Sequence, residues 1–418
     1  MTPELTLEEI QNFKGKYPKQ IWYLFLSEMW ERFSFYGMRG MLIIFMFERL
    51  HLAEKEANLK YGAIQAFVYA LAFVGGLFAD KILGFRKSIF WGGLLMIVGS
   101  FILAFSPEHL FYIGISFTIV GTGFFKPNIS TMVGTLYKEG DPRRDAGFSL
   151  FYSGINIGGL LGGAFCIKVA DTYSWNMAFS LAGIFMILGL AIFVFTQRLL
   201  GPIGKKPFKK DGTPVHKYSE YAVYIGSLLI IPFILLLVRN TQYTDLFMYI
   251  IGPATLLYIF YEMRNYSKVE NQKLIAALIF IIFSIFFWAF FEQCGGSLSL
   301  FARYNLEGSF LGFDPNQINN SSNNFFVVIL SPLVGLIWLW LNKRNMEPNT
   351  VVKFGLAFLF LGGGFFVFYS TRLFATPEGM ASLPLFTLAY FVMTIGELCL
   401  SPIGLSIMTK LSPKPLWG

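Results

Sequence analysis

The 418-residue chain has few charged residues. Asp, Glu, Lys and Arg make up 14% of it and hydrophobic residues make up 55%, whereas a soluble domain carries about 25% charged residues. A soluble globular protein is therefore excluded. Apolar runs of roughly 20 residues, the length that crosses a bilayer core, recur along the chain. They do not alternate as the strands of a membrane barrel do, so the composition predicts an all-α polytopic membrane protein.

Cysteine is scarce, which argues against a fold held by disulfides or by a metal bound to cysteines. Cys166, Cys294 and Cys399 lie far apart in apolar runs, so we expect buried free thiols rather than a disulfide framework or a metal site. The polar, acidic N-terminus (1–20) does not have the pattern of a cleavable signal peptide.

Histidine and nucleotide-binding motifs are also sparse. His51, His109 and His216 all fall in expected loops, which argues against a proton relay or a metal ligand among them. The segment GPIGKK (201–206) has neither the spacing nor the Ser/Thr of a P-loop. No bound cofactor is expected.

The apolar runs predict twelve membrane-spanning helices. We place them at residues 21–48, 58–80, 86–106, 109–134, 145–169, 175–196, 220–238, 244–263, 272–301, 318–341, 351–371 and 382–410. Counted over the connecting segments, 23 Lys and Arg fall on one side of the membrane and 6 on the other. The positive-inside rule then places both termini in the cytoplasm. The net charge of +8 is thus a topology signal, and nucleic-acid binding is not expected.

Seven charged residues lie deep inside the predicted spans, away from the ends. The acids are Glu28, Glu31, Glu292 and Glu397, and the bases are Arg32, Arg39 and Lys126. Because an ionised group in a bilayer costs a few kcal/mol even on mild scales, these side chains should line an interior cavity, mostly paired. The surplus acid suggests that a carboxyl is protonated at times. The alternative is a structural ion-pair network that only joins helices, which is a costly route to stability.

Spacing and position favour a carrier. Glu28, Glu31 and Arg32 stand at i, i+3 and i+4, on one helix face, and Arg39 follows two turns later. The first and fourth helices carry the Glu/Arg cluster and Lys126. After two inserted helices, the first and fourth helices of the second half carry Glu292 and Glu397. Charges at matching places in two halves are typical of a carrier built from two related halves, with its site at mid-membrane.

Six motifs give a resemblance to a known family. They are EMWERFSFYG (28–37), GGLFADKILGFRK (75–87), GTGFFKPNIS (121–130), FYSGINIGG (151–159), FWAFFEQCGGSLSLFA (287–302) and GELCLSPIGLS (396–406). The first resembles the ExxERFxxYG signature of the proton-dependent oligopeptide transporter (POT/PTR) family of the major facilitator superfamily, and the fourth resembles its FYxxINxG signature. The resemblance runs from about residue 17 to the end, and the two inserted helices are typical of bacterial members.

The resemblance implies a major facilitator fold and a domain division. The division is a six-helix N-terminal bundle (1–197), a basic cytoplasmic loop (198–219), two inserted helices (220–263) and a C-terminal bundle (264–418). The family has six helices in each half, so this C-terminal bundle is expected to be incomplete after its fourth helix. Two further departures are Phe35, where many members carry tyrosine, and INNSSNNFF (318–326), where only Ser321 and Asn323 match a Gln-Ser-x-Asn-Pro run.

The resemblance also implies a function and its residues. The function is uptake of di- and tripeptides coupled to protons by alternating access, with protons as the coupling ion. Matching positions assign proton coupling to Glu28, Glu31, Arg32, Lys126 and Glu292. They assign substrate binding to Tyr36, Arg39, Tyr69, Lys126, Asn156, Trp288, Asn323, Glu397 and Ser401. A cytoplasmic gate is expected at Asp80, Arg86 and Lys87, with a solvated loop as the alternative reading.

Other functions remain to be weighed. A carrier of another small anion such as nitrate would use the same fold, but it would not need an amine-binding acid such as Glu397. A transport-inactive fragment is a further alternative. A receptor would need a signalling domain, and an intramembrane protease would need a catalytic motif in its spans; neither is readable in the sequence. We expect a non-enzymatic, monomeric protein of the cytoplasmic (inner) membrane, whose partners are peptides and the lipid bilayer.

Overall fold

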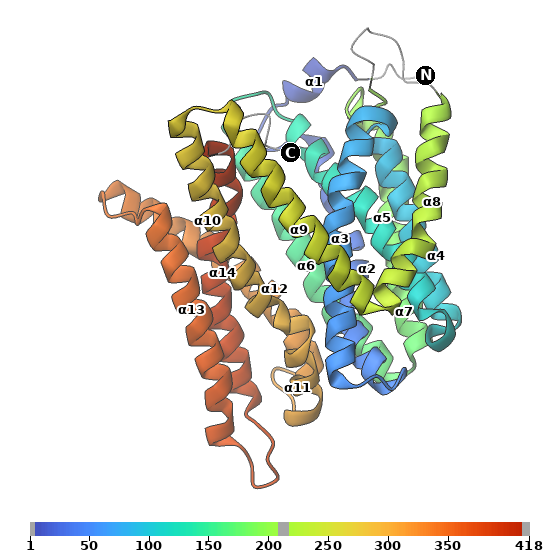
Figure 1. Cartoon of the computed structure of the whole chain (residues 1–418), viewed down its shortest axis with the longest axis vertical. Coiled ribbons are helices and arrows are strands. Elements are labelled where there is room, and N and C mark those ends of the chain that lie inside the picture. Colours follow the sequence, from blue (N-terminus) through green and yellow to red (C-terminus); the bar gives the residue numbers. More distant parts are fainter. Residues whose placement is uncertain (1–4, 208–216, 412–418) are drawn as a thin grey trace. The chain divides into compact units, whose positions relative to one another are not determined.

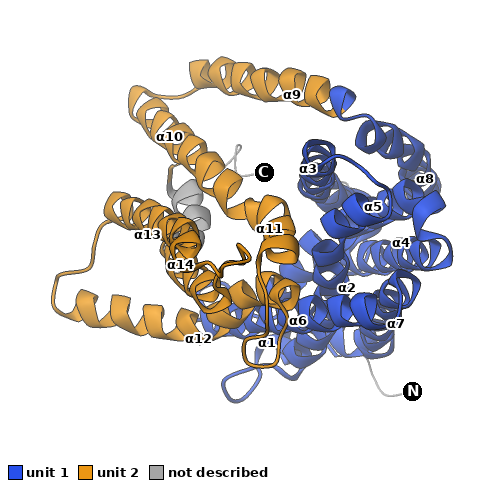
Figure 2. Cartoon of the chain, turned by 90° about the horizontal axis from the view of Figure 1, so that it is seen from below, with its two compact units in different colours: residues 1–243 blue, residues 244–418 orange. Residues whose placement is uncertain are grey.

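A computed structural model describes residues 5–207 and 217–411, with the side chains of 401–410 left out. The chain divides into two compact units, residues 1–243 and 244–418 (Figure 2). Within the described ranges the ordered backbone is helical and only isolated β-bridges occur. The all-α prediction is therefore confirmed (Figure 1).

Each predicted span has a counterpart in the structure. The long helices are α2 (Lys19–Glu48), α3 (Glu54–Phe78), α4 (Phe85–Phe105), α5 (Pro107–Thr135), α6 (Arg143–Thr172), α7 (Trp175–Thr196), α8 (Lys217–Arg239), α9 (Thr241–Glu262), α10 (Lys268–Phe291), α12 (Pro315–Lys343), α13 (Thr350–Ser370) and α14 (Leu383–Leu411). Short elements are α1 (Leu7–Gln11) and α11 (Ser297–Asn305), a π-helical turn (Ala79–Leu83) and several 3₁₀ turns.

One predicted helix is not continuous. The span expected at 272–301 ends at Phe291, continues as a 3₁₀ turn over Glu292–Gly295, and resumes as α11 at Ser297. Gly296, with φ −109° and ψ −115°, separates the two parts. The predicted span corresponds to one candidate membrane-crossing segment, Lys268–Asn305. Its helix is interrupted at Gly296, because glycine lacks the side chain that restricts these backbone angles.

Membrane-spanning character is shared by most of these helices. Among the described residues, eleven helical segments are long and apolar enough to cross a membrane. Helix α2 is not one of them, because Glu28, Glu31, Arg32 and Arg39 interrupt its apolar sequence. Those four side chains are buried or half-buried within the protein. Neighbouring helices therefore keep the charged groups of α2 away from lipid.

Helix α2 occupies the centre of unit 1, where it packs against α6 and α7. Glycines of α6 allow this close approach. A Cβ atom on Gly158 would lie 2.1 Å from the Met29 carbonyl oxygen, and one on Gly162 would lie 2.2 Å from that of Phe33. Four-residue spacing of small residues is typical of close helix packing, and Gly154, Gly158 and Gly162 of α6 serve that packing here.

Helix α8 is bound to other parts of unit 1 near both of its ends. Near its start, Glu220 pairs with Lys87 of α4 and with Lys206, and the indole of Trp91 donates to the Ser227 hydroxyl at 2.9 Å. At its end, the buried ammonium of Lys60 donates to the Arg239 carbonyl at 2.5 Å. The last carbonyl groups of a helix have no helical N–H to bind. The Lys60 ammonium supplies a donor to one of them, and its positive charge is favourable at a helix C-terminus.

The N-terminal segment also docks on unit 1. The Arg143 guanidinium lies over the Phe13 ring at 3.8 Å and donates to the carbonyls of Phe13 and Gly15, each at 3.1 Å. It also donates to Asp141 at 2.7 Å. Hydrogen bonds from Arg143 hold the pKa of the Asp141 carboxyl below its ordinary value, so this pair stays ionised at neutral pH.

Unit 2 is assembled around α14. Helices α10, α12 and α13 pack against it, and Phe287, Phe386, Tyr390 and Met393 are buried in its core. Helices α10, α12 and α13 begin with side-chain caps from Ser267, Asp314 and Asn349, which satisfy N–H groups that a helix start leaves open. The 3₁₀ turn after α10 packs against α12.

Candidate functional site

The first cluster is a buried triad on α2. Glu28, Glu31 and Arg32 are 1%, 0% and 1% exposed. The Arg32 guanidinium donates to Glu31 Oε1 at 2.5 Å through one arm and to Glu31 Oε2 through Nε. Arg32 Nε also lies 3.4 Å from Glu28 Oε1. Two acids thus share one base on one face of α2, as their spacing predicts.

The sharing is unequal. Glu31 takes the two-pronged contact that a guanidinium and a carboxylate form best, whereas Glu28 Oε2 has no hydrogen-bond partner in the described part of the chain. The face of the guanidinium lies 4.8 Å from the Phe35 ring centre. Phe35, the residue that departs from the family pattern, therefore contributes an aromatic face to Arg32.

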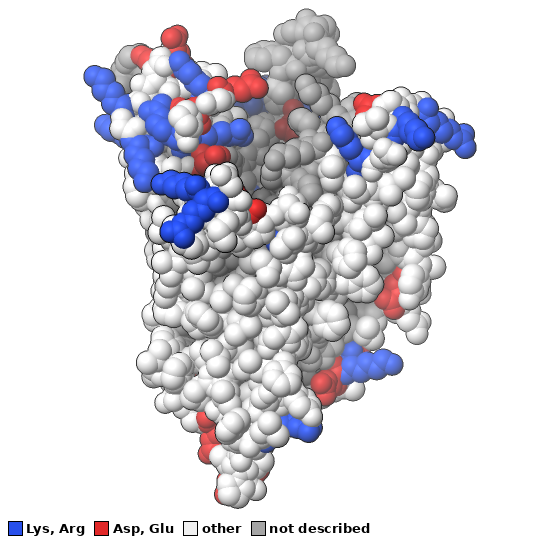
Figure 3. Space-filling model, turned by 90° about the vertical axis from the view of Figure 1, so that its left-hand side faces the viewer, with Lys and Arg blue, Asp and Glu red and all other residues white. Residues whose placement is uncertain are grey.

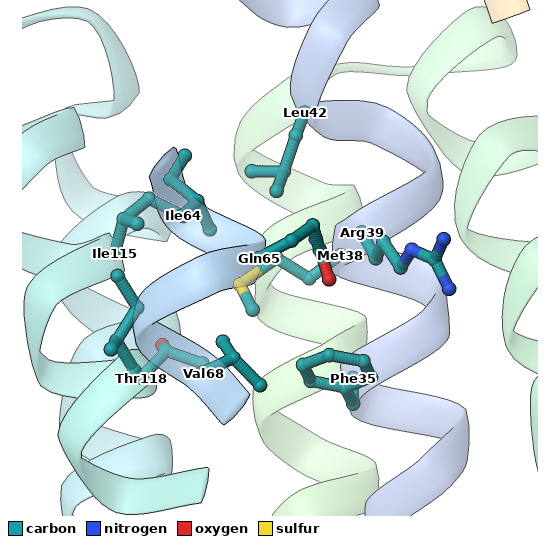
Figure 4. Close-up of a pocket in the computed structure, with 10 residues that line it drawn as sticks. Phe35, Met38, Arg39, Leu42, Ile64, Gln65, Val68, Ile115 and Thr118 are labelled. Carbon is teal, nitrogen blue, oxygen red and sulfur yellow. The ribbon is translucent and has the colours of Figure 1, made fainter. Parts of the chain in front are cut away.

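Arg39 stands on the same helix with partners of its own. Its Nε donates to the Tyr61 hydroxyl of α3 at 2.8 Å, and its guanidinium lies 5.6 Å from the Tyr36 ring centre. Figure 4 shows the Arg39 guanidinium pointing away from a small apolar cavity that also involves Gln65 and Thr118. That cavity measures about 10 Å³, which is room for about one water molecule. A peptide does not fit there.

Lys126 lies on α5, directly before Pro127, and is half-buried. Its ammonium lies over the Tyr69 ring, 4.9 Å from the centre. Within the described part of the chain, Lys126 makes no ion pair. Both acids of the triad are paired with Arg32 instead, so Lys126 is a cation held by an aromatic face. Asn156 of α6 is buried and donates to the Tyr152 carbonyl of its own helix at 2.9 Å.

The acidic site residues of unit 2 lie on α14 and at the break after α10. Glu397 is 7% exposed and accepts a hydrogen bond from Asn323 of α12 at 2.7 Å. Asn323 also donates to the Thr394 hydroxyl at 3.2 Å. Glu292 is half-buried at the start of the 3₁₀ turn, and Trp288 packs edge-on against Phe291 one turn earlier. The side chain of Ser401 and the whole of His216 lie outside the described residues.

Two of the expected gate residues, Arg86 and Lys87, bind different neighbours. Arg86 donates to the carbonyls of Ile203 at 2.7 Å and Gly201 at 2.5 Å, whereas Lys87 pairs with Glu220. Asp80 is exposed. Arg86 and Lys87 thus fasten the segment after α7 and the start of α8.

Three partners were missed by the sequence reasoning: Tyr61, Asn319 and Glu220. Each is joined to its partner by tertiary contacts across 22 to 133 positions, and no local pattern marks such a pairing. None of the three cysteines is in a disulfide, and Cys166 and Cys399 are buried as predicted, whereas Cys294 is half-buried. Among the residues that the structure describes, no group of His, Cys, Asp and Glu is arranged to hold a metal ion.

Two units of apolar helices with buried charges define a polytopic carrier of the major facilitator fold, and comparison with known proteins agrees. The model of the POT family (PTR2) matches residues 86–418. The peptide transporter YePEPT of Yersinia enterocolitica is 34% identical, over 94% of this chain and 82% of its own. The dipeptide and tripeptide permease B of Xenorhabdus bovienii is 30% identical, over 96% of this chain and 82% of its own.

A solved structure is similar over nearly the whole chain. It is a glutamate-to-glutamine mutant of a peptide transporter POT in complex with alafosfalin, with a TM-score of 0.85 and 31% identity, covering 99% of this chain and 87% of that one. The present chain belongs to the POT family. It is thus a multi-pass membrane transporter and not an enzyme.

Proposed function

We propose that the protein is a proton-coupled symporter that takes up di- and tripeptides by alternating access. The observation that carries the proposal is the triad of Glu28, Glu31 and Arg32, in which two buried acids share one guanidinium. A second ionised acid beside a single base is costly in a low-dielectric interior. Protonation of one carboxyl removes that cost, so the triad is suited to take up and release a proton.

The same proposal assigns the two ends of a peptide. Arg39 and Lys126 of unit 1 would bind the peptide carboxylate, with Tyr36 and Tyr69 as the rings that hold these cations. Glu397 of unit 2 would bind the peptide amine, with Asn323 orienting the carboxylate and Asn156, Trp288 and Ser401 as further lining residues. Glu292 would exchange the coupling proton with a basic partner. A carrier of a simple anion such as nitrate has no use for the buried acid at position 397.

We also propose the orientation and the organisation of the chain. Basic side chains gather mainly at one end of the face in Figure 3, which supports cytoplasmic termini in an inner membrane by the positive-inside rule. The division at residues 197, 219 and 263 and a monomeric state belong to the same proposal. Asp80, Arg86 and Lys87 would act at the cytoplasmic end, where Arg86 and Lys87 already fasten neighbouring segments.

Uptake by proteoliposomes tests the proposal. Labelled dialanine should accumulate inside vesicles when an inward proton gradient and potential are imposed, and a protonophore should abolish this accumulation. Glu292→Gln should lose driven uptake and keep exchange of peptide across the membrane. Accumulation of nitrate but not dialanine would favour the anion carrier, and accumulation of neither would contradict both proposals.

A further inference from the structure

A ladder of buried and half-buried polar residues runs through unit 2. On α12, Asn319 and Asn323 stand one turn apart, and on α14, Tyr390, Thr394 and Glu397 follow one another at helical spacing. Hydrogen bonds join these five residues within one unit, and the link between Thr394 and Tyr390 runs through the Tyr390 backbone carbonyl. Polar groups in a membrane protein interior are costly unless they are satisfied, so a complete series of this kind calls for a role.

One end of the ladder is the candidate amine site. Glu397 accepts from Asn323 Nδ2 at 2.7 Å, the same amide donates to the Thr394 hydroxyl at 3.2 Å, and that hydroxyl donates to the Tyr390 carbonyl at 2.7 Å. A change in the charge or position of Glu397 therefore acts directly on Asn323, and through Thr394 on the α14 turn that carries Tyr390.

The other end is the break that carries Glu292. The Tyr390 hydroxyl donates to Asn319 Oδ1 at 2.6 Å, and Asn319 Nδ2 donates to the Cys294 carbonyl at 2.9 Å. Cys294 lies in the 3₁₀ turn that begins at Glu292. Broken helices need side chains to satisfy backbone carbonyls in place of helical N–H groups. Asn319 does so while it is itself fixed by Tyr390, and both are nearly inaccessible, at 2% and 1% exposed.

We propose that Asn319 and Tyr390 are positioning residues that hold the Glu292 segment in register with the Glu397 site. This inference rests on the proposed function, in which Glu292 handles the proton and Glu397 the peptide amine. The ladder makes the conformation of the break depend on the state of Glu397, so that binding at one carboxylate is felt at the other. Asn319 and Tyr390 touch neither substrate nor proton themselves.

The native thiol of Cys294 reports on the break without any transport assay. Because Cys166 and Cys399 are buried, maleimide labelling of the full chain in detergent should occur mainly at Cys294, with Cys294→Ser as the blank. Asn319→Leu should speed labelling roughly three- to tenfold, the effect of losing one or two net hydrogen bonds. Tyr390→Phe, which keeps the ring packed on Phe386, should give a smaller increase.

The matched control is Thr387→Val. Thr387 is a buried residue of α14 whose hydroxyl bonds only within its own helix, to the Leu383 carbonyl at 2.9 Å. It should label at the wild-type rate. Wild-type rates in both Asn319→Leu and Tyr390→Phe would overturn the proposal, as would an equal increase in Thr387→Val. If Asn319→Leu does not fold, Tyr390→Phe against Thr387→Val decides alone.

Transport assays distinguish failure of this inference from failure of the proposed proton-coupled peptide uptake. In proteoliposomes, Asn319→Leu and Tyr390→Phe should retain peptide exchange and lose driven uptake, whereas Thr387→Val should retain both. Equal losses of exchange and driven uptake would reduce the ladder to a structural support and overturn the positioning role. If wild-type protein moves no dialanine, the proposed function fails, and the labelling rates still decide whether the ladder holds the break.

Discussion

Arg39 and Tyr61 are joined across two helices by a hydrogen bond of 2.8 Å from the guanidinium Nε to the phenol oxygen. This bond fixes the guanidinium that we assign to the peptide carboxylate. Tyr61→Phe should raise the KM for dialanine roughly tenfold with little change in kcat, because one hydrogen bond to a charged group contributes about 1.5–3 kcal/mol. Uptake kinetics in proteoliposomes measure both constants.

Tyr137→Phe is the control for Tyr61→Phe. The Tyr137 hydroxyl is buried and has no hydrogen-bond partner among the described residues, so its removal should leave KM unchanged. An unchanged KM in Tyr61→Phe would show that Arg39 is held by its other contacts.

Glu397 should distinguish peptides by their amine. Glu397→Gln keeps the hydrogen bond from Asn323 and removes the negative charge. Binding of dialanine should weaken by roughly thirtyfold or more, since loss of one member of a buried charge pair costs about 2–5 kcal/mol. N-acetyl-dialanine, which has no cationic amine, should bind wild type and variant alike. Equal losses for the two ligands, measured by competition against labelled dialanine, would remove Glu397 from the amine site. Glu378→Gln, in an exposed loop, is the matched control.

Glu220 should matter more to stability than either lysine that it contacts. Glu220→Gln weakens two ion pairs at once, whereas Lys87→Met leaves Lys206 in place. We expect the first change to cost about 1.5–3 kcal/mol, the size of hydrogen bonds to charged groups, and the second to cost less, because Lys87 is half exposed. Thermal unfolding in detergent ranks the two variants, and a larger loss in Lys87→Met would contradict this account of α8.

Gly158 should not tolerate even one methyl group. Gly158→Ala places a Cβ atom 2.1 Å from the Met29 carbonyl oxygen and 2.9 Å from the Arg32 Cβ, so α2 and α6 must separate. Overpacking of this kind costs about 1–3 kcal/mol and would displace Arg32. Gly252→Ala on α9 meets no atom within 4 Å, and it should be neutral or slightly stabilising, as alanine favours a helix. Equal melting temperatures for the two variants would show that the crossing can relax.

Much of the helical arrangement could be predicted because the signals are local. Apolar length places the spans, glycine spacing on α6 predicts its close packing, and the i, i+3, i+4 spacing places Glu28, Glu31 and Arg32 on one face of α2. The break after α10 was not predicted, because the apolar run continues on both sides of Gly295 and Gly296. The pair is the signal that could have found it.

The contacts that complete the site could not be predicted in the same way. The asparagine-rich stretch at 318–326 looked only like a departure from the family pattern, and it is the part of α12 that reaches Glu397, Tyr390 and Cys294. Asn319 and Tyr390 stand 71 positions apart, and their pairing depends on how α12 and α14 pack. Sequence identifies the polar residues; packing decides which of them meet.

The fastening of α8 has a consequence for the order in which the protein is made. Lys60 emerges from the ribosome early, but the carbonyl that accepts its hydrogen bond belongs to Arg239, which is synthesised almost 180 residues later. Lys87 likewise waits for Glu220. When only helices α2 to α7 have been made, Lys60 therefore lacks its carbonyl partner and Lys87 lacks its carboxylate. We expect insertion factors to shelter these side chains until translation has passed residue 239.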